Sequence, residues 1–395
     1  MYPSKIIVAL TGSIACYKAC ELISLLIKKG FDVQTVASTS ALEFVGEATL
    51  EGLTRKPVLT SPLSRSSMMQ HIDLPKWADA LVIAPATANT INSMAAGLAS
   101  DLLGNILLAW EPQKPLLVVP AMNQKMWAHP SVQKSIDQLK SWHHVIVPPT
   151  SGNLACGETG LGRLAEPEVI FSQIVKQLNP QGKKVLITAG GTQEPLDDVR
   201  CISNNSSGRT GLFLAERLFE AGFNVTLLKS GVLETKYPDI STLPFRTFDD
   251  LDQQLRKVLS ETSFDFVLHA AAVSDFRVKE PLPGKIKSTD ELNLSLVPNE
   301  KLLSKIKTYS LNPDLKVIGF KLTSGATEDE IASAVKRQML GENSDWVLHN
   351  DLKLLSDTSH HFSLFDPTGV VATGPSKSEM ANQFIHLLRD EGVTP

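Results

Sequence analysis

Small polar residues follow several short apolar runs, which is where an open α/β sheet gathers its ligand-binding groups. The residues concerned are Gly12 and Ser13 after run 5–10, Ser38 after 32–37, Thr87 after 80–84 and Asn123 after 116–119. Because the carboxyl ends of parallel strands meet at one edge of a sheet, one crevice would collect them. The polar residues ahead of run 80–84, His71 among them, are expected to join it.

The turn at Gly12 and Ser13 admits two interpretations. It is either a simple turn, or it places backbone N–H groups and a hydroxyl on a phosphate at the start of a helix expected over 15–29. The three-glycine spacing of a dinucleotide fingerprint is absent here. A mononucleotide such as a flavin phosphate therefore fits this turn better than a dinucleotide.

Three further side chains have useful chemistry, each with a plainer alternative. His71 is otherwise a surface histidine. Asn123 either holds a carboxylate or caps the next helix. Cys156 lies in a glycine-rich stretch and is either an accessible reactive thiol or a buried inert one. The four cysteines show no metal-ligand pairing, which indicates reduced thiols in a cytosolic protein.

The length and composition set the frame for these residues. A chain of 395 residues exceeds what one hydrophobic core usually serves, so two domains are expected. The net charge of −4 does not suggest a nucleic-acid-binding surface. The apolar run at the start is too short for a signal peptide, and no later run would span a membrane. We therefore expect a cytoplasmic protein without membrane partners.

The elements that must position these residues alternate between strands and helices in both halves. In the first half we expect strands at 5–10, 32–37, 80–84, 116–119 and 145–147, and helices at 15–29, 125–140 and 167–178. Residues 152–163, with four glycines, are interpreted as a mobile loop. This rhythm is typical of a doubly wound α/β sheet.

The second half repeats the pattern after an expected linker at 179–183, which gives domains 1–178 and 184–395. We expect strands at 184–188, 224–228, 264–269, 315–320, 346–349 and 361–365, and helices at 209–221, 249–260 and 376–389. Residues 193–208 are expected to form a long polar loop. A second α/β domain follows from this pattern.

Several motifs carry a resemblance to known families. Residues 11–18, 71–90, 120–123 and 154–157 resemble the flavin-dependent cysteine decarboxylases. Residues 190–195, Arg200, 203–204, 206–208, 271–275 and 285–287 resemble phosphopantothenate-cysteine ligase. In this order the chain resembles the bacterial bifunctional coenzyme A biosynthesis proteins. The resemblance implies a Rossmann-like flavoprotein domain followed by a Rossmann-like ligase domain.

For the first domain the resemblance implies FMN-dependent decarboxylation of 4'-phospho-N-pantothenoylcysteine to 4'-phosphopantetheine and CO2. A flavin makes this possible by taking hydride from the carbon that bears sulfur and later returning it. In the family the histidine matching His71 acts as base or positions the thiol, and the cysteine matching Cys156 protonates the product. The residues implied in FMN binding are Gly12, Ser13, Ser38 and Thr87, and those implied in substrate binding are Met122 and Asn123.

For the second domain the resemblance implies ligation of 4'-phosphopantothenate to L-cysteine through an acyl nucleotide, with CTP converted to CMP and pyrophosphate. Magnesium and cations would offset the charge on the phosphates. The implied residues are Asn204 and Arg200 for the substrate, Ala271, Asp275 and Phe320 for the nucleotide, and Lys285 for the phosphates. Without the family, residues 285–287 are a solvated basic strip.

The ligase motifs also depart from the family pattern. Ser288 stands where a further lysine is usual, and Gln338 and Glu342 stand where bacterial ligases commonly carry lysines. Lys336 and Arg337 are possible substitutes, and the choice between CTP and ATP stays open. The metal ligands also stay open.

The family's assembly and two rival classes complete the expectations. Family decarboxylase domains form trimers and ligase domains form dimers, so a homo-oligomer, up to a dodecamer, is implied. The alternative is a non-catalytic FMN-binding regulator of the same fold, which typically lacks part of the histidine, asparagine and cysteine set. A generic nucleotide-dependent oxidoreductase is disfavoured because the three-glycine fingerprint is missing.

Overall fold

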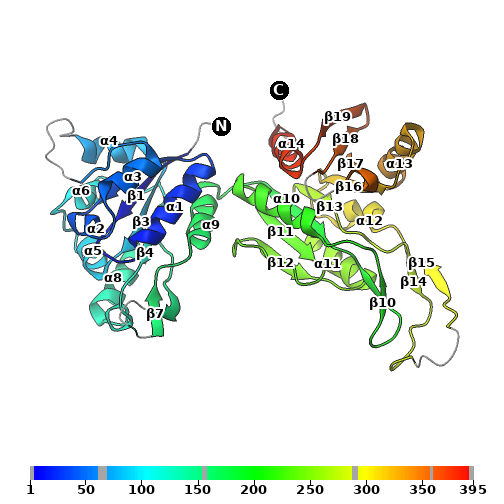
Figure 1. Ribbon diagram of the computed structural model, residues 1–395, viewed down its shortest axis with the longest axis horizontal. Coiled ribbons are helices and arrows are strands. Elements are labelled where there is room, and N and C mark those ends of the chain that lie inside the picture. The colour runs from blue at the N-terminus through cyan, green and yellow to red at the C-terminus, as the bar shows by residue number, and fades with distance from the viewer. Residues whose placement is uncertain are drawn as a thin grey trace. The chain divides into compact units, whose positions relative to one another are not determined.

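The structure is a computed structural model that describes residues 4–60, 69–153, 157, 159–286, 292–355 and 359–390. The chain divides into two compact units, Met1–Pro180 and Gln181–Pro395 (Figure 1). Each unit has its own parallel sheet covered by helices. Among the described helices, none has the length and apolar character that crossing a bilayer requires.

The first unit is built on a five-stranded parallel sheet in the order β2-β1-β3-β4-β5. Its strands are β1 Lys5–Leu10, β2 Asp32–Ala37, β3 Ala80–Ala86, β4 Leu116–Pro120 and β5 Val145–Ile146. Every residue of β3 and β4 is buried. Helices cover both faces, which is why these strands are continuous apolar runs without alternation.

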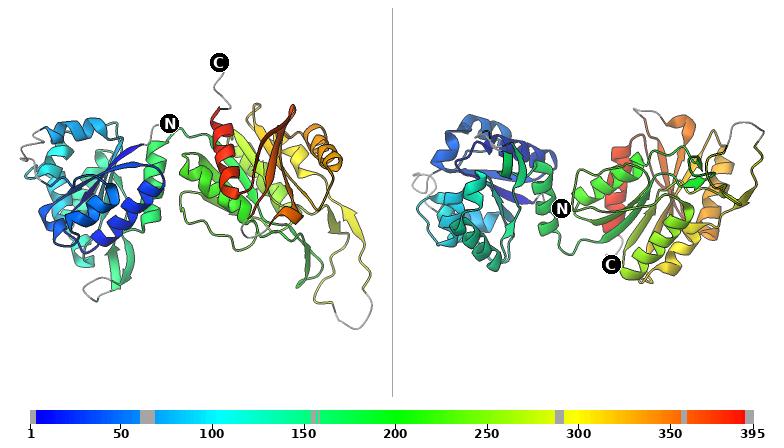
Figure 2. Two further views of the ribbon diagram at one scale, coloured as in Figure 1. Left: turned by 45° about the horizontal axis from the view of Figure 1, so that its top comes forward. Right: turned by 90° about the horizontal axis from the view of Figure 1, so that it is seen from below.

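Helices lie on both faces of this sheet. On one face α1 (Cys16–Lys28) contacts α3 (Glu47–Thr54) and α9 (Pro167–Leu178) (Figure 2). The helices of the other face share one apolar core with the sheet: α4 Gln70–Trp77, α5 Ala88–Ala95, α6 Leu102–Leu108 and α8 Pro130–Ser141. The short helices α2 (Thr39–Leu42) and α7 (Gln124–Trp127) follow β2 and β4.

Two expectations for the first unit are wrong. The single helix expected over 125–140 is interrupted, because Pro130 begins α8 and has no N–H to continue an earlier helix. The glycine-rich stretch 152–163 is not simply a loop, since β6 (Thr150–Asn153) and β7 (Thr159–Arg163) pair as an antiparallel ribbon. His71 also lies in a helix, α4, that the sequence patterning did not indicate.

The second unit has an eight-stranded sheet in the order β12-β11-β8-β13-β16-β17-β18-β19. Its strands are β8 Lys184–Ala189, β11 Asn224–Lys229, β12 Ser241–Pro244, β13 Phe266–His269, β16 Lys316–Thr323, β17 Trp346–Asp351, β18 Phe362–Asp366 and β19 Gly369–Gly374. The pairs from β12 to β17 are parallel, and β18 and β19 add an antiparallel edge.

Helices again cover both faces. The helices are α10 Arg209–Glu220, α11 Phe248–Glu261, α12 Leu302–Tyr309, α13 Glu328–Gly341 and α14 Lys377–Asp390, with a short 3₁₀ turn at Leu352–Leu354. A Cβ on Gly319 of β16 would meet Leu303 of α12 and Gln338 of α13. The next residue, Phe320, points to the opposite face, where its ring contacts Phe384 of α14. Figure 2 shows α14 beside α10, in agreement with their contacts.

The expected polar loop at 193–208 is wrong in part. It contains β9 (Gln193–Pro195) and β10 (Cys201–Ser203), which pair antiparallel. A second small ribbon, β14 (Phe276–Val278) with β15 (Leu296–Pro298), lies in a stretch with no expected element. The overall prediction of two doubly wound α/β domains is nevertheless confirmed.

Candidate functional site

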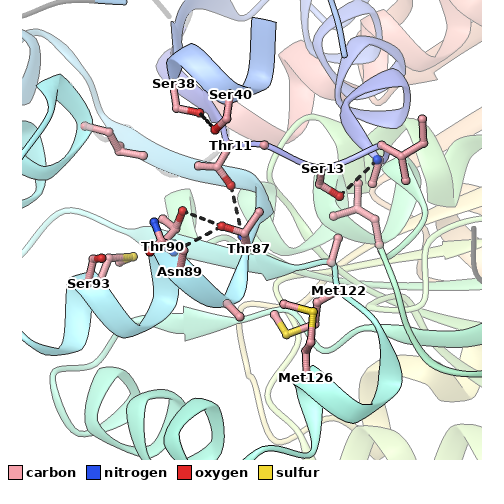
Figure 3. Close-up of a pocket in the computed structure, with 18 of the residues that line it drawn as sticks. Thr11, Ser13, Ser38, Ser40, Thr87, Asn89, Thr90, Ser93, Met122 and Met126 are labelled. Carbon is pink, nitrogen blue, oxygen red and sulfur yellow. Dashed lines mark hydrogen bonds between the residues drawn. The ribbon is translucent and has the colours of Figure 1, made fainter. Parts of the chain in front are cut away.

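The strand order of the first unit fixes where a ligand site belongs. From β1 the chain moves to β2 on one side and then to β3 on the other, so the strand order reverses between β1 and β3. Ligands of open α/β sheets bind at such a switch point, and flavodoxin, whose sheet has the same 2-1-3-4-5 order, binds FMN there. A cavity of about 750 Å³ opens at this point (Figure 3). Its volume is within the usual range for small-molecule sites.

Thr11 joins the two strands at the floor of this cavity. Its hydroxyl donates to the carbonyl of Pro85 at 2.7 Å and accepts from the N–H of Thr87 at 3.1 Å. The Thr87 hydroxyl in turn accepts from the N–H of Thr90 and so caps α5 (Figure 3). The first loop after β1 and the first turn of α5 are therefore held in one fixed arrangement.

The polar side of the cavity can bind an anion. Ala15, the N-cap of α1, has no side-chain acceptor, and the N–H groups of Cys16 and Lys18 donate to the Ser13 and Ala15 carbonyls instead, while the start of the helix lines the cavity. Gly12 lies so close to Ser40 that a Cβ would come within 2.6 Å of its hydroxyl oxygen. Ser13 and Ser38 add hydroxyls at the same end. These groups suit the phosphate of a mononucleotide.

Apolar side chains also line the cavity. Its lining includes Met94, Leu98, Leu103, Leu107, Met122 and Met126. Figure 3 shows Met122 and Met126 side by side, away from the hydroxyl groups. An amphipathic ligand with a flat ring system and a phosphate tail matches this division.

Asn123 lies in the cavity wall at the end of β4. Its side-chain oxygen accepts from the N–H of Lys125 at 2.8 Å and caps α7. The two interpretations of this residue are therefore compatible, because capping uses the oxygen and a ligand carboxylate would use the amide N–H groups.

Ribbon β6–β7 lies against the loop that carries Asn123. The N–H of Met122 donates to the carbonyl of Gly162 at 3.0 Å. A Cβ on Gly162 would stand 2.1 Å from the Met122 carbonyl oxygen, and one on Gly160 would stand 1.8 Å from the side-chain oxygen of Gln124. The two glycines thus let β7 lie flush on this loop. Cys156, which comes between β6 and β7 in the sequence, lies outside the described residues.

The sequence-predicted residues of the first unit do not all meet in the cavity. Those that line it are Gly12, Ser13, Ser38, Thr87, Met122 and Asn123. His71 is half-buried in the first turn of α4 and is not among the residues that line this cavity, so the expected place in the same crevice is not seen for His71 in the described part of the chain, and its chemical role stays a prediction.

Sequence reasoning missed several lining residues, Lys18 above all. Lys18 is only 3% exposed, and its ammonium contacts both carboxylate oxygens of Glu166 at 2.8 Å. Arg163 contacts the same carboxylate at 3.2 Å. Since Lys18 ends the motif 11–18, its position within that motif was the available signal. Asn89, Thr90 and Ser93 were missed because they follow Thr87 on a helix and not on a strand end.

The second unit has its own switch point, between β8 and β13, because β11 and β12 lie on one side of β8 and β13 and β16 on the other. The turn after β8 is bonded to the loop after β13. Ala272 donates to Gly190 at 2.9 Å, Thr192 donates back to Ala272 at 3.2 Å, and Ser274 donates to the Thr192 hydroxyl at 3.0 Å.

Asn204 reaches this pair of loops. Its side-chain amide donates to the carbonyls of Ala272 and Val273 at 3.1 and 3.2 Å. The predicted residues Asn204 and Ala271 are therefore brought to the same pair of loops. The Ala271 N–H donates to the Thr188 hydroxyl at 3.0 Å.

A buried histidine supports the same loop and was not foreseen from the sequence. His269 Nδ1 lies 3.0 Å from the Thr188 hydroxyl. Burial lowers the pKa of His269 to about 4, so its ring is neutral at physiological pH.

Arg200 is held by a buried carboxylate. Its guanidinium donates to Asp197 at 3.0 Å and to the Ile286 carbonyl at 3.2 Å. Burial raises the pKa of Asp197, but N–H groups of Ile286, Val199 and Arg200 together with the Arg200 charge outweigh this and lower the pKa overall. Arg200 thereby braces the segment that carries the exposed Lys285. Lys287 and Ser288 lie outside the described residues.

Asp275 and Phe320 occupy different surroundings. Asp275 is exposed, and one carboxylate oxygen lies 2.5 Å from the Lys301 ammonium. Phe320 has its ring 6.1 Å from that of Phe384. Its predicted nucleotide contact is not tested by this packing.

The helix α13 does not present Gln338 to solvent. Gln338 is 6% exposed, lies beside Gly319, and its side-chain oxygen has no hydrogen-bond partner among the described residues. Lys336 and Arg337 are exposed, and Glu342 is half-buried. Within the described ranges no cluster of three or more His, Cys, Asp or Glu side chains could hold a metal ion.

Comparisons with known proteins match both units. The flavoprotein family model matches residues 1–179, and the model of the DNA/pantothenate metabolism flavoprotein C-terminal domain matches residues 180–390. The coenzyme A biosynthesis bifunctional protein CoaBC of Haemophilus influenzae is 36% identical, over 88% of this chain and 86% of its own length. The Escherichia coli protein of that name is 32% identical over 99% of this chain and 97% of its own length.

A solved structure, the FMN binding protein AtHal3, is 34% identical, covering 44% of this chain and 95% of that one with a TM-score of 0.39. The two family models together span nearly the whole chain, and relatives more than 30% identical align along most of it. The chain therefore belongs to the family of bifunctional coenzyme A biosynthesis proteins, as its motifs indicated.

Proposed function

We propose that this chain carries out two consecutive reactions of coenzyme A biosynthesis, one in each unit. The second unit ligates 4'-phosphopantothenate to L-cysteine with CTP and Mg²⁺, and the first unit decarboxylates the product with FMN. The observation that carries this proposal is a cavity at the switch point of the first sheet and a pair of hydrogen-bonded loops at that of the second, in a chain whose two halves match the two family models. We place the enzyme in the cytoplasm as a homo-oligomer, with trimeric decarboxylase and dimeric ligase contacts.

The first cavity fits FMN in its chemistry. The start of α1 with Gly12, Ser13 and Ser38 would hold the phosphate, Thr87 would bind on the side of α5, and the methionine and leucine wall would cover the ring. Bound FMN supplies a reversible hydride acceptor. The match to the flavoprotein model supports this assignment.

The residues of the first unit then act on the substrate. Asn123 donates its amide N–H groups to the substrate carboxylate and so fixes which substrate carbon faces the flavin ring. Met122 contacts the substrate beside Asn123. His71 holds the thiol or accepts its proton, and Cys156 returns a proton to the ene-thiol after CO2 has left. The net reaction consumes no oxidant, because the hydride removed from the substrate is returned to it.

The second unit activates a carboxylate. A carboxylate oxygen of 4'-phosphopantothenate attacks the α-phosphorus of CTP, and pyrophosphate leaves. Asn204 and Arg200 bind the acyl nucleotide and its substrate, Ala271, Asp275 and Phe320 bind the nucleotide, and Lys285 offsets phosphate charge. The cysteine amine then attacks the acyl carbon and releases CMP. Mg²⁺ is expected to arrive with the triphosphate, since the described residues form no acidic cluster of their own.

A single assay on the purified full chain tests both halves. The protein is supplied with 4'-phosphopantothenate, L-cysteine, Mg²⁺ and either CTP or ATP, while pyrophosphate, CO2 and the visible spectrum are recorded. We expect a yellow protein with CTP-dependent pyrophosphate release followed by CO2. A yellow protein that decarboxylates added 4'-phospho-N-pantothenoylcysteine but releases no pyrophosphate would refute the ligase half. A yellow protein without either activity would be a flavin-binding regulator.

A further inference from the structure

The ion pair between Asp275 and Lys301 joins the loop after β13, just before β14, to the N-cap of α12. The Lys301 ammonium is 2.5 Å from a carboxylate oxygen of Asp275, and the two side chains are 56% and 64% exposed. Asn299 fixes the backbone nearby, since its N–H donates to the Asp275 carbonyl at 2.8 Å and its amide donates to the Ser274 carbonyl at 2.9 Å. Lys301 is thus placed by the structure beside the loop that also binds Asn204.

Two other cations near this loop are more firmly held than Lys301. Arg200 is bound to Asp197, whose side chain is fully buried, and to a backbone carbonyl. Arg277 donates to the side-chain oxygen of Asn299. Lys301 has three N–H donors and gives one to an exposed carboxylate. Such an exposed ion pair contributes little to stability. An incoming anion therefore replaces the Asp275 carboxylate as the partner of one Lys301 N–H at a small cost in free energy.

A polyanion that binds beside Asp275 requires a cation at this point. A polyphosphate that approaches Asp275 would be repelled by its carboxylate unless a positive charge lies between them. Gln338 cannot supply one, since it is neutral and buried in the interior. Lys301 carries the needed charge and already contacts Asp275.

We propose that Lys301 binds the polyphosphate of the nucleoside triphosphate, with Asp275 holding its ammonium in position. The proposal rests on the ligase activity proposed above. It adds the N-cap residue of α12 to the nucleotide site, and it accounts for a triphosphate contact in a chain that has Ser288, Gln338 and Glu342 where lysines are usual.

The test compares two lysines one helical turn apart. Lys301→Met removes the proposed contact, and Lys305→Met is the matched control, because Lys305 lies on the same helix and pairs with Glu300. Binding of CTP with Mg²⁺ is measured by equilibrium dialysis without 4'-phosphopantothenate, and KM values for CTP and cysteine are measured in turnover. We expect Lys301→Met to raise the CTP Kd and KM about ten-fold, with the cysteine KM unchanged and a partial recovery in Lys301→Arg.

The outcomes separate this inference from the function on which it rests. If Lys301→Met binds CTP as tightly as Lys305→Met does, or if only the cysteine KM rises, the proposal is refuted while the ligase assignment stands. If the unaltered chain neither binds CTP nor releases pyrophosphate, the ligase assignment itself fails.

Discussion

Asn123 shows how one carboxamide serves both structure and chemistry. Its oxygen caps α7 through the N–H of Lys125. Replacement by Ala would remove both the cap and the amide donors, and a lost cap alone costs about 1 kcal/mol. Asn123→Asp keeps the cap acceptor and replaces the donors with a negative charge.

We expect Asn123→Asp to lower the decarboxylation rate by about 100-fold or more, because the negative charge of the aspartate would repel the substrate carboxylate that the amide N–H groups would bind. FMN content is expected to stay near that of the unaltered protein. CO2 release and the absorbance of the bound flavin measure the two effects. Normal decarboxylation in Asn123→Asp would remove Asn123 from the substrate site.

His269 gives a pH dependence with a definite sign. Burial lowers its pKa to about 4 in the folded chain, against an ordinary value near 6.5. The unfolded chain therefore takes up a proton first, and stability falls as the pH drops from about 6.5 to about 4. Between pH 7 and pH 5 this linkage removes about 2 kcal/mol of the free energy of unfolding.

His269→Met is expected to be less stable than the unaltered protein at pH 7, since the Thr188 hydroxyl loses its contact with the ring and keeps only that with the Ala271 N–H among the described residues. The difference should shrink by about 2 kcal/mol at pH 5, because the variant has no proton to take up there. Urea unfolding of residues 181–395 at the two pH values measures this. His386→Met, an exposed histidine on α14, is the control and should leave the pH slope unchanged. A difference that grows toward pH 5 would contradict the assignment.

Site residues at strand ends could be predicted from the sequence. Site residues positioned by a helix, or by contact with a segment distant in the sequence, could not be predicted. Ser38 and Thr87 line the cavity because each directly follows a recognisable strand. Lys18 was missed because its partner, Glu166, is distant in sequence and an ion pair of this kind leaves no local pattern. His269 was missed because a histidine that ends an apolar strand gives no sign of its burial.

At the scale of elements, ribbon β6–β7 was misjudged because glycine usually marks loops. Gly160 and Gly162 instead alternate along β7, which puts both on the face that meets the loop 122–124. The single helix expected over 125–140 merged α7 with α8, although Pro130 marks a new first turn with His129 as the cap.

Gly162→Ala is expected to weaken decarboxylation more than flavin binding. Its Cβ would lie 2.1 Å from the Met122 carbonyl oxygen, so β7 must move away from the Asn123 loop at a cost of about 1–3 kcal/mol. Gly152→Ala is the matched control on the partner strand, because its Cβ would meet only the Arg163 side chain, at 3.4 Å. Equal effects of the two substitutions on CO2 release would show that the flush contact of β7 is unimportant.

At the scale of the whole molecule, two sheets with separate switch points predict two separable activities. We expect Asn204→Ala to abolish ligation and leave decarboxylation, because its amide holds only Ala272 and Val273 of the second unit. His71→Asn is expected to do the reverse. Pyrophosphate release and CO2 release from added 4'-phospho-N-pantothenoylcysteine measure the two activities in each variant. Loss of both activities in either variant would overturn the assignment of two sites.

The general architecture of both units was accessible from the sequence because parallel strands buried on two faces are continuous apolar runs, as β3 illustrates. Short ribbons such as β9–β10 and β14–β15 were not, since strands of three residues are too short to show a periodicity. β10 ends just before Asn204 and β14 begins just after Asp275, so the part of the fold hardest to foresee lies beside the predicted chemistry.

The residues proposed for the second site follow the carboxyl ends of β8 and β13, so the amino ends of the same strands take no part in that site. Ser263 is exposed just before β13, and the Asp265 carboxylate accepts a hydrogen bond from the N–H of Lys184. A chemical handle introduced at Ser263 would thus attach the protein to a resin or a sensor chip through the amino end of this sheet. The loops that carry Asn204 and Asp275 would then face the flowing solution, ready for surface-based measurement of nucleotide binding.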